Sequence, residues 1–455
     1  RSTPQALIGR EDVTKPNNLT AAEMAAALAA GDVSSEALTQ ACLDRVDERE
    51  QTVHAWAHLD SDIALAQARA ADAARAEGNI RGPLHGVPVG IKDIIDTVDM
   101  PTENGSEVFR GRRPARDASC VALLRAAGAV IMGKTVTTEF AMTGQRGTSN
   151  PHDAARTPGG SSSGSGAAVA DFMVPLALGS QTGGSVIRPA SFCGTYGYKP
   201  SFGSISRHGV FILARVLDHI GVYGRSLDDL AIIGDVLMQH DPLDFDMRAD
   251  PNGHLCEALA AHAPAAPRLA FVKGPPWVAA ENHLDDIFAP YITAIGDQVQ
   301  EVELAGIFDN ILDVHTTVMN GNLWANLAGF VEDQGDQLLE ETNRRVSAGK
   351  GGLAADYIHA REMTDSYCAA LDGLFEHYDA IITAGAPGEA PVGLESTGNA
   401  AFQRMWTLTG LPTVTLPLLK GPNGMPIGVQ VIGRKGHDGD LFRAAQWVDA
   451  QGGQR

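Results

Sequence analysis

Short apolar runs alternate with longer helix-like segments along most of this chain. The apolar runs predict strands at 53–59, 87–91, 129–134, 174–178, 269–272, 379–383, 414–417 and 425–432. The segments between them, several of them rich in alanine, predict helices at 21–30, 35–50, 61–77, 118–127, 167–170, 226–238, 282–299, 313–332 and 353–377. Residues 196–209 have neither pattern and are interpreted as a loop. This alternation favours an α/β sandwich.

The chain gives little sign of separate domains. Its 455 residues allow one large domain or up to three, at roughly 150 residues per domain. Composition shifts at 241–267, where Pro, Asp, His and Ala dominate, but the strands that follow resemble members of the same sheet. We therefore expect a polar N-terminal arm at 1–19 and a single domain at 20–455, with a surface excursion at 241–267.

Charge and composition narrow the class of protein. Hydrophobic residues make up 44% and charged residues 20% of the chain, and the formal net charge is −20. A nucleic-acid-binding surface needs a basic face, so this balance argues against a nucleic-acid partner. It leaves room for a local basic pocket.

Cysteine usage and the absence of long apolar runs suggest a cytoplasmic protein. The five cysteines are scattered and form no CxxC pair, which disfavours a disulfide framework or a zinc site. No apolar run approaches the roughly 18 residues of a membrane span, and the N-terminal segment has no apolar signal core. We expect no membrane association.

Two knots of Gly and Ser dominate the segment from Thr157 to Ser201. The first is GGSSSGSG at 159–166 and the second is GSQTGGS at 179–185. Such composition is also typical of a flexible linker. Here, however, the residues between the knots are apolar and would not lie in a solvated coil. Glycine lets a ligand approach the backbone, so the two knots indicate a site built from main chain.

Lys92 stands in the apolar sequence GVPVGIKDII. On a strand, Val87, Val89 and Ile91 share one face and Lys92 points to the other. A lone lysine is usually a solvated surface group. A lysine held in a poorly solvated pocket instead has a depressed pKa and can act as a base near neutral pH.

The second knot suggests a nucleophile. Gly183-Gly184-Ser185 places a hydroxyl after two glycines, in a turn whose amides could stabilise an oxyanion. The serine needs a base, but the sequence contains no GxSxG elbow around it and no histidine in a recognisable triad motif. Lys92 is the best candidate base, with a relay hydroxyl from the first knot. A phosphate-binding loop would need GxxxxGK[ST], and no lysine follows Gly164.

Several pieces together resemble the amidase signature family of serine hydrolases. They are GVPVGIKD around Lys92, KTVTTEFA from Lys134, NPHDAARTPGGSSSGSGAA from Asn150, GSQTGGSVIRPASFCG around Ser185, YGYKPSFG from Tyr196, and the C-terminal LTGLPTVTLPL and GMPIGVQVIG. The resemblance runs from about residue 20 to 445, and GIKDIIDT and MPTENGSE look similar to the malonamidase branch. It implies a three-layer α/β/α sandwich around a mixed, mostly parallel twisted sheet, and it implies no metal or organic cofactor.

The resemblance also implies a Ser–cis-Ser–Lys triad. Carried over by position, Ser185 is the nucleophile, Ser161 the bridging serine behind a cis peptide bond, and Lys92 the base. The backbone amides of Thr182, Gly183, Gly184 and Ser185 would form the oxyanion hole. The implied reaction cleaves the C–N bond of a small amide through an acyl-enzyme.

Arg188, Gln181 and Gly160 are the candidates for substrate contact. Arg188 lies three residues after Ser185. It either holds the loop by a salt bridge or grips a substrate carboxylate with two hydrogen bonds. The malonamidase resemblance implies an acid-amide substrate of that second kind. Gln181 stands where many family members have Asp, which changes the charge beside the oxyanion turn.

The roles of other polar residues are left open. Ser162 and Ser180 either hydrogen-bond within the triad or satisfy turn amides, and Ser163 is interpreted as structural. His85, Thr137 and Trp406 are candidates for the pocket wall, without a position that the sequence can assign.

Three functions compete. The leading one is a hydrolase of small amides of malonamate type, acting alone or as a homodimer. The alternatives are the glutaminase-type A subunit of a tRNA-dependent amidotransferase and an aryl or aliphatic acylamidase. A catalytically inactive binding module is disfavoured because Lys92, Ser161 and Ser185 are all present.

Overall fold

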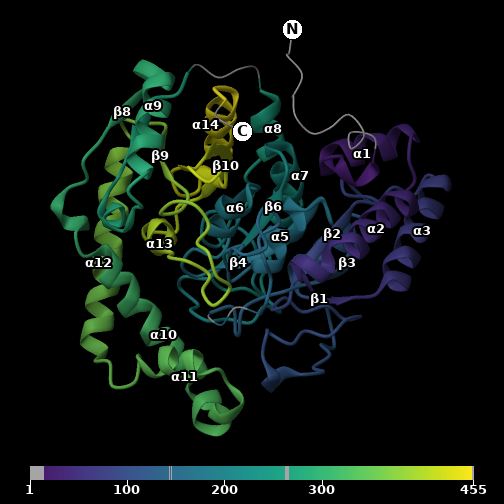
Figure 1. Ribbon diagram of the computed structural model, residues 1–455, viewed down its shortest axis with the longest axis horizontal. Helices are drawn as coiled ribbons and strands as arrows, with labels where there is room; N and C mark the ends of the chain where they lie inside the picture. The colour runs from purple at the N-terminus through teal and green to yellow at the C-terminus, as the bar shows by residue number, and fades with distance from the viewer. Residues whose placement is uncertain (1–14, 143, 145, 262–265, 453–455) are drawn as a thin grey trace.

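One large sheet organises the molecule (Figure 1). The structure is a computed structural model that describes residues 15–142, 144, 146–261 and 266–452. Within these residues the sheet has eleven strands in the order β1-β3-β2-β4-β6-β5-β10-β11-β9-β7-β8. The strands are β1 Trp56–Leu59, β2 Pro88–Lys92, β3 Val130–Thr135, β4 Leu176–Gln181, β5 Tyr196–Lys199, β6 His219–Gly224, β7 Leu269–Phe271, β8 Val299–Glu301, β9 Ala380–Ala384, β10 Thr413–Lys420 and β11 Pro426–Ile432.

The sheet is mixed, as expected, but it is not mostly parallel. Antiparallel pairs (β1–β3, β4–β6, β5–β6, β5–β10, β10–β11 and β9–β11) outnumber the parallel pairs (β2–β3, β2–β4, β7–β9 and β7–β8). The mostly parallel sheet that the family resemblance implied is therefore wrong, and three of the antiparallel pairs involve β5 or β6, which were not predicted. Both are short strands that contain glycine, and their pairing partners, not their own patterns, stabilise them.

Helices cover both faces of the sheet. They are α1 Ala21–Ala30, α2 Ser35–Val53, α3 Ser61–Ala76, α4 Ser119–Ala126, α5 Ser163–Ala170, α6 Ile187–Cys193, α7 Leu227–Leu237, α8 Leu255–Ala260, α9 Leu284–Ile295, α10 Ile311–Gln334, α11 Glu340–Ser347, α12 Ala354–Leu374, α13 Ala401–Leu408 and α14 Asp438–Ala450. The capping box of α1 is present, with Thr20 and Glu23 each binding the other's backbone amide. The three-layer α/β/α architecture is thus confirmed.

Alternation along β2 and β4 separates two cores. Val89, Ile91, Leu176 and Leu178 belong to the larger apolar cluster, which also includes residues of α1, α4, α7 and α14. Ala177 points to the smaller cluster, which includes residues of α2, α3, α5 and α6. Because strand side chains alternate between faces, Lys92 points toward the face that carries α5 and α6.

The segment predicted as an excursion packs against the domain. Arg207 forms ion pairs with Asp244 (3.0 Å) and Asp246 (2.6 Å), and α8 contacts α7 and α14. The strands before and after this segment belong to the same sheet.

Most of the arm predicted at 1–19 lies outside the described residues. Its last part, Pro16–Asn18, forms a 3-10 helix, and the carbonyl of Asn17 accepts a hydrogen bond from Arg225 (3.0 Å). None of the helices in the described part of the chain has the length and apolarity needed to cross a bilayer.

Candidate active site

Lys92 lies at the end of β2, between β3 and β4. Its side chain is fully buried. Its Nζ lies 2.8 Å from the hydroxyl oxygen of Ser161 and 2.8 Å from that of Ser180. The Lys92–Ser161 pair predicted from the sequence is therefore in contact, and Ser180 is a second hydroxyl on the same amine.

The surroundings of Lys92 favour its neutral form. Burial lowers the pKa of Lys92 well below its usual 10.5, and the charge of Asp218 acts in the opposite direction with a smaller effect. A neutral amine has one lone pair, so it can accept a hydrogen bond from one hydroxyl while it donates to the other. Neither hydroxyl requires Lys92 to be charged, and the site can therefore hold an amine that takes up a proton.

The first knot forms the entry to α5. The peptide bond between Gly160 and Ser161 is cis, as the family resemblance implied. The carbonyl of Ser161 accepts a hydrogen bond from the amide of Thr138 (3.2 Å), and Ser163 donates to the carbonyl of Gly159 (2.9 Å). A Cβ at Gly160 would lie 2.5 Å from Cγ2 of Thr397, so a side chain does not fit there.

The second knot forms a turn between β4 and α6 in which every carbonyl is occupied. The donors are His315 Nε2 to Thr182 (3.0 Å), Thr407 Oγ1 to Gly183 (2.7 Å), the Arg188 amide to Gly184 (3.0 Å) and the Tyr223 hydroxyl to Ser185 (3.1 Å). By contrast, the amide N–H groups of Gly183, Gly184 and Ser185 donate to no described residue. The turn thus holds its carbonyls in place and leaves these amides free to bind an oxyanion.

Ser185 is the accessible serine of the two knots. It is half-buried, whereas Ser161 is 2% exposed. Its hydroxyl makes no hydrogen bond with any described residue. The structure thus brings Ser161 to Lys92, but the Ser161–Ser185 contact that the triad implies is not among the described hydrogen bonds, and the Ser185 hydroxyl is left open to a substrate.

Gln181 supports the turn from within the protein. Its side-chain oxygen accepts hydrogen bonds from the amides of Val186 (2.8 Å) and Ile187 (3.1 Å), and its amide nitrogen donates to Thr407 (2.9 Å). It is 1% exposed. Gln181 therefore fixes the start of α6 and the turn that carries Ser185, and the expected substrate contact is not among its interactions.

Arg188 ties the two knots together. It donates from Nη2 to the carbonyl of Gly160 (2.6 Å) and to Thr397 (3.1 Å), and from Nη1 to the carbonyl of Gly398 (2.6 Å). Burial lowers the pKa of Arg188 to about 9. Neither role predicted for it is seen: it holds the loop through carbonyls instead of a salt bridge, and its side chain is turned toward the cis peptide instead of an open pocket.

Several residues that hold the site have no motif in the sequence. The hydroxyl of Thr182 donates to the buried carboxylate of Asp218 (2.6 Å), whose pKa burial raises to about 6. Burial also favours the neutral form of His315, because it lowers the pKa of this imidazole to about 3. The neutral ring donates a hydrogen bond from Nε2 to the carbonyl of Thr182. His315 sits in an ordinary helical pattern, and nothing in its spacing indicates that it reaches the turn.

The described part of the structure shows no hydrogen bond of His85, Thr137 or Trp406 with the triad residues, although all three were candidates for the pocket wall. His85 contacts the carbonyl of Ala71 (2.9 Å) in the packing of α3. Thr137 bonds the carbonyl of its neighbour Thr138 (3.1 Å). Trp406 is 2% exposed and belongs to the core.

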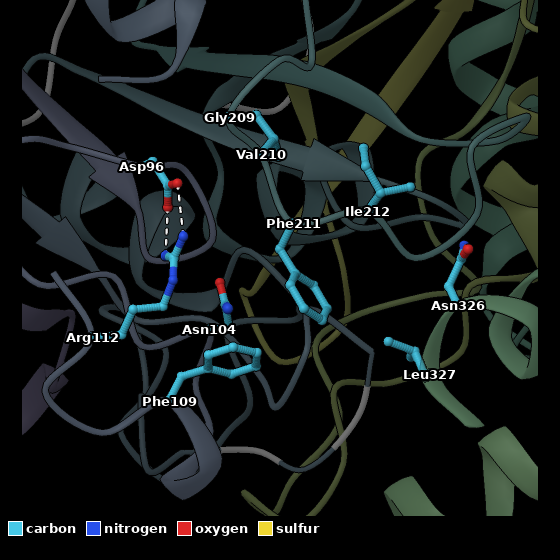
Figure 2. A pocket seen from close by; sticks show the side chains of 10 residues that line it. All are labelled: Asp96, Asn104, Phe109, Arg112, Gly209, Val210, Phe211, Ile212, Asn326 and Leu327. Atoms are coloured by element: carbon cyan, nitrogen blue, oxygen red, sulfur yellow. Dashed lines mark hydrogen bonds and ion pairs between the residues drawn. The ribbon is translucent and has the colours of Figure 1, made fainter. Parts of the chain in front are cut away.

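A cavity of about 380 Å³ lies among residues outside the two knots (Figure 2). Its walls include Phe109, Phe211 and Asn326, and the ion pair of Arg112 with Asp96 (2.7 Å) closes one side. None of the triad residues lines it. The chemistry of the two knots is therefore not in this cavity.

Comparison with known sequences gives a consistent picture. A family model described as Amidase matches residues 37–442. The A subunit of the glutamyl-tRNA(Gln) amidotransferase of Streptomyces avermitilis is 33% identical over 476 residues, covering 95% of each chain. Its counterpart from Chloroflexus aurantiacus is 33% identical over 479 residues, covering 95% of this chain and 96% of the other. The malonamidase branch, expected from the sequence, is not the name these relatives carry.

Solved structures show the same fold. A chain of a complex described as vestigial, and as revealing the origins of an s-triazine catabolic enzyme, superposes with a TM-score of 0.90 at 27% identity, covering 96% of this chain and 99% of the other. The peptide amidase of Stenotrophomonas maltophilia gives a TM-score of 0.81 at 27% identity, covering 96% and 98%. A 6-aminohexanoate cyclic dimer hydrolase, at 23% identity and a TM-score of 0.82 over 95% and 97%, shares the fold.

Proposed function

This chain belongs to the amidase family, and we propose that it cleaves the C–N bond of a small carboxamide through Ser185, Ser161 and Lys92. The observation that carries this is the buried contact of Lys92 with Ser161, at 2.8 Å, in a setting that lowers the pKa of the amine. It provides the base that Ser185 otherwise lacks.

Acylation would follow a relay of two hydroxyls. Neutral Lys92 takes the proton of Ser161 as Ser161 takes that of Ser185, and the Ser185 oxygen attacks the amide carbonyl. The amides of Thr182, Gly183, Gly184 and Ser185 would receive the negative charge that develops on the carbonyl oxygen. The relay then returns the proton to the leaving nitrogen, which departs as ammonia or an amine.

Deacylation would use the same relay with water. Lys92 and Ser161 remove a proton from a water molecule that attacks the ester of Ser185, and the returning proton restores the serine hydroxyl. The products are the free carboxylic acid and the original enzyme, so no residue is consumed.

Three substrate classes compete, namely a malonamate-type acid amide, glutamine, and an aryl or aliphatic amide, and the names of the relatives favour glutamine. A malonamate-type acid amide follows from the sequence resemblance alone. The relatives reported above are named as the A subunits of amidotransferases, which supports glutamine as the amide and implies work alongside other subunits. Because this distinction concerns only the substrate, the relay and nucleophile are the same in all three.

The direct test is ammonia release by the purified chain from glutamine, malonamate and acetamide, with aniline release from an anilide. Ser185→Ala should lose activity by about 10³-fold or more. Ser366→Ala is the matched control, because the Ser366 hydroxyl is exposed on α12 and its one hydrogen bond within the described residues goes to the carbonyl of Glu362 (3.2 Å). Hydroxylamine trapping should place the acyl group on the peptide containing Ser185.

Each possible result of this test supports or excludes one of the proposed functions. Full activity in Ser185→Ala would exclude the mechanism. Activity that appears only when other subunits are added would support the amidotransferase alternative, whereas turnover by the purified chain would support a hydrolase that acts alone.

A further inference from the structure

The cavity between Phe109 and Asn326 has the size and the lining of a small-molecule site (Figure 2). Its volume is about 380 Å³, and small-molecule pockets of about 300–1,000 Å³ combine apolar walls with a few polar groups. The apolar side chains that line it are those of Phe109, Val210, Phe211, Ile212 and Leu327. The polar ones are the carboxamides of Asn104 and Asn326 and the ion pair of Arg112 with Asp96.

Asn104 is a buried amide without a hydrogen-bond partner for its side chain. It is 2% exposed, and its Oδ1 accepts no hydrogen bond. Its Nδ2 donates to none of the residues that the structure describes. Buried polar side chains are normally hydrogen-bonded, so each exception requires an explanation. Because Asn104 lines the cavity, a ligand there can supply the partner that the protein does not.

The backbone of Asn104 is held on both sides, so its amide has a defined position. The N–H of Asn104 donates to the carbonyl of Asp93 (2.9 Å), and its carbonyl accepts from the N–H of Phe140 (2.8 Å). Its φ is +53°, in the left-handed region that asparagine and glycine enter more readily than other residues. Glycine at position 104 would therefore remove the amide without adding backbone strain.

Phenylalanines from different segments form the aromatic wall of the cavity. The ring of Phe109 meets those of Phe211 and Phe140 edge to face, with centroids 5.7 and 5.9 Å apart. Phe330 of α10 lies 5.4 Å from Phe109. Aromatic rings gain most from another ring placed edge to face or offset. This wall therefore favours a ligand with an aromatic ring.

The lining of the cavity has no unpaired charge. Arg112 binds Asp96 through two hydrogen bonds, from Nη1 to Oδ1 (2.7 Å) and from Nη2 to Oδ2 (2.9 Å). The remaining polar side chains are the two carboxamides, of which Asn326 donates to the carbonyl of Leu213 (2.7 Å). An ionised ligand would lose hydration without gaining a free counter-ion. The cavity therefore suits a neutral molecule.

We propose that this cavity binds a neutral aromatic carboxamide, with its ring against Phe109 and Phe211 and its amide on Asn104. A carboxamide has both an N–H donor and a carbonyl acceptor, so it complements the side chain of an asparagine in either orientation of that side chain. This goes beyond the proposed function, because no triad residue lines the cavity and binding there requires no cleavage.

Three probes of nearly equal shape test the ligand class. Benzamide has the full carboxamide, acetophenone replaces its NH₂ with a methyl group, and benzoate replaces the amide with an anion. Ligand-observed NMR titrations use the full chain with Ser185→Ala, which prevents turnover of benzamide. Benzamide should bind about 10-fold more tightly than acetophenone, and about 10-fold or more tighter than benzoate.

Two further substitutions in the Ser185→Ala chain separate the amide from the ring. Asn104→Gly should weaken benzamide binding about 10-fold and acetophenone binding less, so that their dissociation constants become similar. Phe211→Leu should weaken both by about 3- to 10-fold and preserve their ratio. Asn79→Gly is the matched control, since Asn79 is exposed and its amide donates to Glu77 (3.2 Å). It should keep both dissociation constants.

The probe series overturns or supports the site without any substitution in the cavity. Equal affinity for benzamide and acetophenone, or tighter binding of benzoate, would contradict a neutral carboxamide site. Benzamide binding that is unchanged in both Asn104→Gly and Phe211→Leu would place the ligand elsewhere, the catalytic turn included. None of these results bears on the proposed amidase activity, which is measured by ammonia release with Ser185 intact.

Discussion

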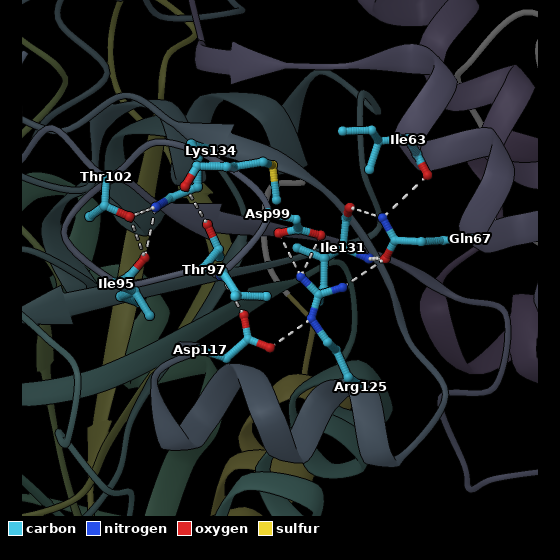
Figure 3. A network of polar contacts seen from close by, with 12 residues as sticks. Ile63, Gln67, Ile95, Thr97, Asp99, Thr102, Asp117, Arg125, Ile131 and Lys134 are labelled. Atoms are coloured by element: carbon cyan, nitrogen blue, oxygen red, sulfur yellow. Dashed lines mark hydrogen bonds and ion pairs between the residues drawn. The ribbon is translucent and has the colours of Figure 1, made fainter. Parts of the chain in front are cut away.

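Two buried lysines on neighbouring strands differ in the chemistry of their hydrogen-bond partners. Lys92 ends β2, and Lys134 lies in β3, where it pairs with Ile91. Both are fully buried, and burial lowers the pKa of both. Lys134, however, donates to the carbonyls of Ile95 (2.7 Å) and Pro101 (3.3 Å) and to the hydroxyl of Thr102 (2.6 Å) (Figure 3). The hydrogen-bond partners of Lys92 among the described residues are both hydroxyls.

The chemistry of the partners explains the difference. Carbonyls only accept hydrogen bonds, so they stabilise a protonated amine, and the carboxylate of Asp93 lies 3.5 Å from Lys134. The pKa of Lys134 is lowered to about 8, above neutral pH. Hydroxyls can also donate, so they tolerate a neutral amine. Burial alone therefore does not make a lysine a base.

The largest expected effect separates the two lysines by activity. Lys92→Met should lower kcat by about 10³- to 10⁴-fold, because the relay loses its proton acceptor. Its thermal unfolding temperature should stay near or above that of the wild type, since a desolvated amine is replaced by an apolar chain of similar length. Steady-state ammonia release and calorimetry measure both. A near-normal kcat in Lys92→Met would show that Lys92, like Lys134, is not the base.

Lys134→Met should do the reverse and affect stability most. It removes the hydrogen bonds to the carbonyls of Ile95 and Pro101 and leaves the Asp93 carboxylate without its buried cation, which costs about 3–5 kcal/mol of unfolding free energy. Urea denaturation gives this value directly. Residual activity per folded molecule should exceed that of Lys92→Met, and a variant as stable as the wild type would show that the Lys134 contacts contribute little.

The smallest effect concerns the second hydroxyl on Lys92. Ser180→Ala removes one of two contacts and should lower kcat by about 10-fold, because the amine loses orientation but keeps Ser161. Ser162→Ala is its neighbour for comparison: Ser162 bonds the backbone of Ser180 (3.2 Å) and not the amine. Equal loss in both variants would indicate a general packing effect instead of a contact with Lys92.

The sequence predicted those features of the site that depend on short stretches of the chain. Alternation in β2 placed Lys92 opposite Val89 and Ile91, and that is confirmed by the two apolar clusters. The second knot indicated Ser185 because Gly183-Gly184-Ser185 is a local pattern, whereas Ser161 was assigned by the family resemblance. Most helices were also predicted, since each carries its own periodicity.

Long-range support could not be predicted in the same way. Gln181 meets Thr407 across 226 positions, and Arg188 meets Gly398 across 210. Such contacts depend on how β4, α6 and α13 pack, and they leave no spacing in the chain. The same limit hid β5 and β6, whose stability comes from their neighbours in the sheet.

The pH dependence of kcat/KM tests the central claim, that a neutral Lys92 is the base, most directly. A base must be deprotonated, so kcat/KM rises with pH through the pKa of Lys92 in the free enzyme. Because burial lowers that pKa well below 10.5, the rise in the wild type should be complete well below pH 10.5. The residual activity of Lys92→Met should lack this rise. A rise centred near pH 10.5, or an identical profile in Lys92→Met, would contradict the assignment of Lys92 as the base.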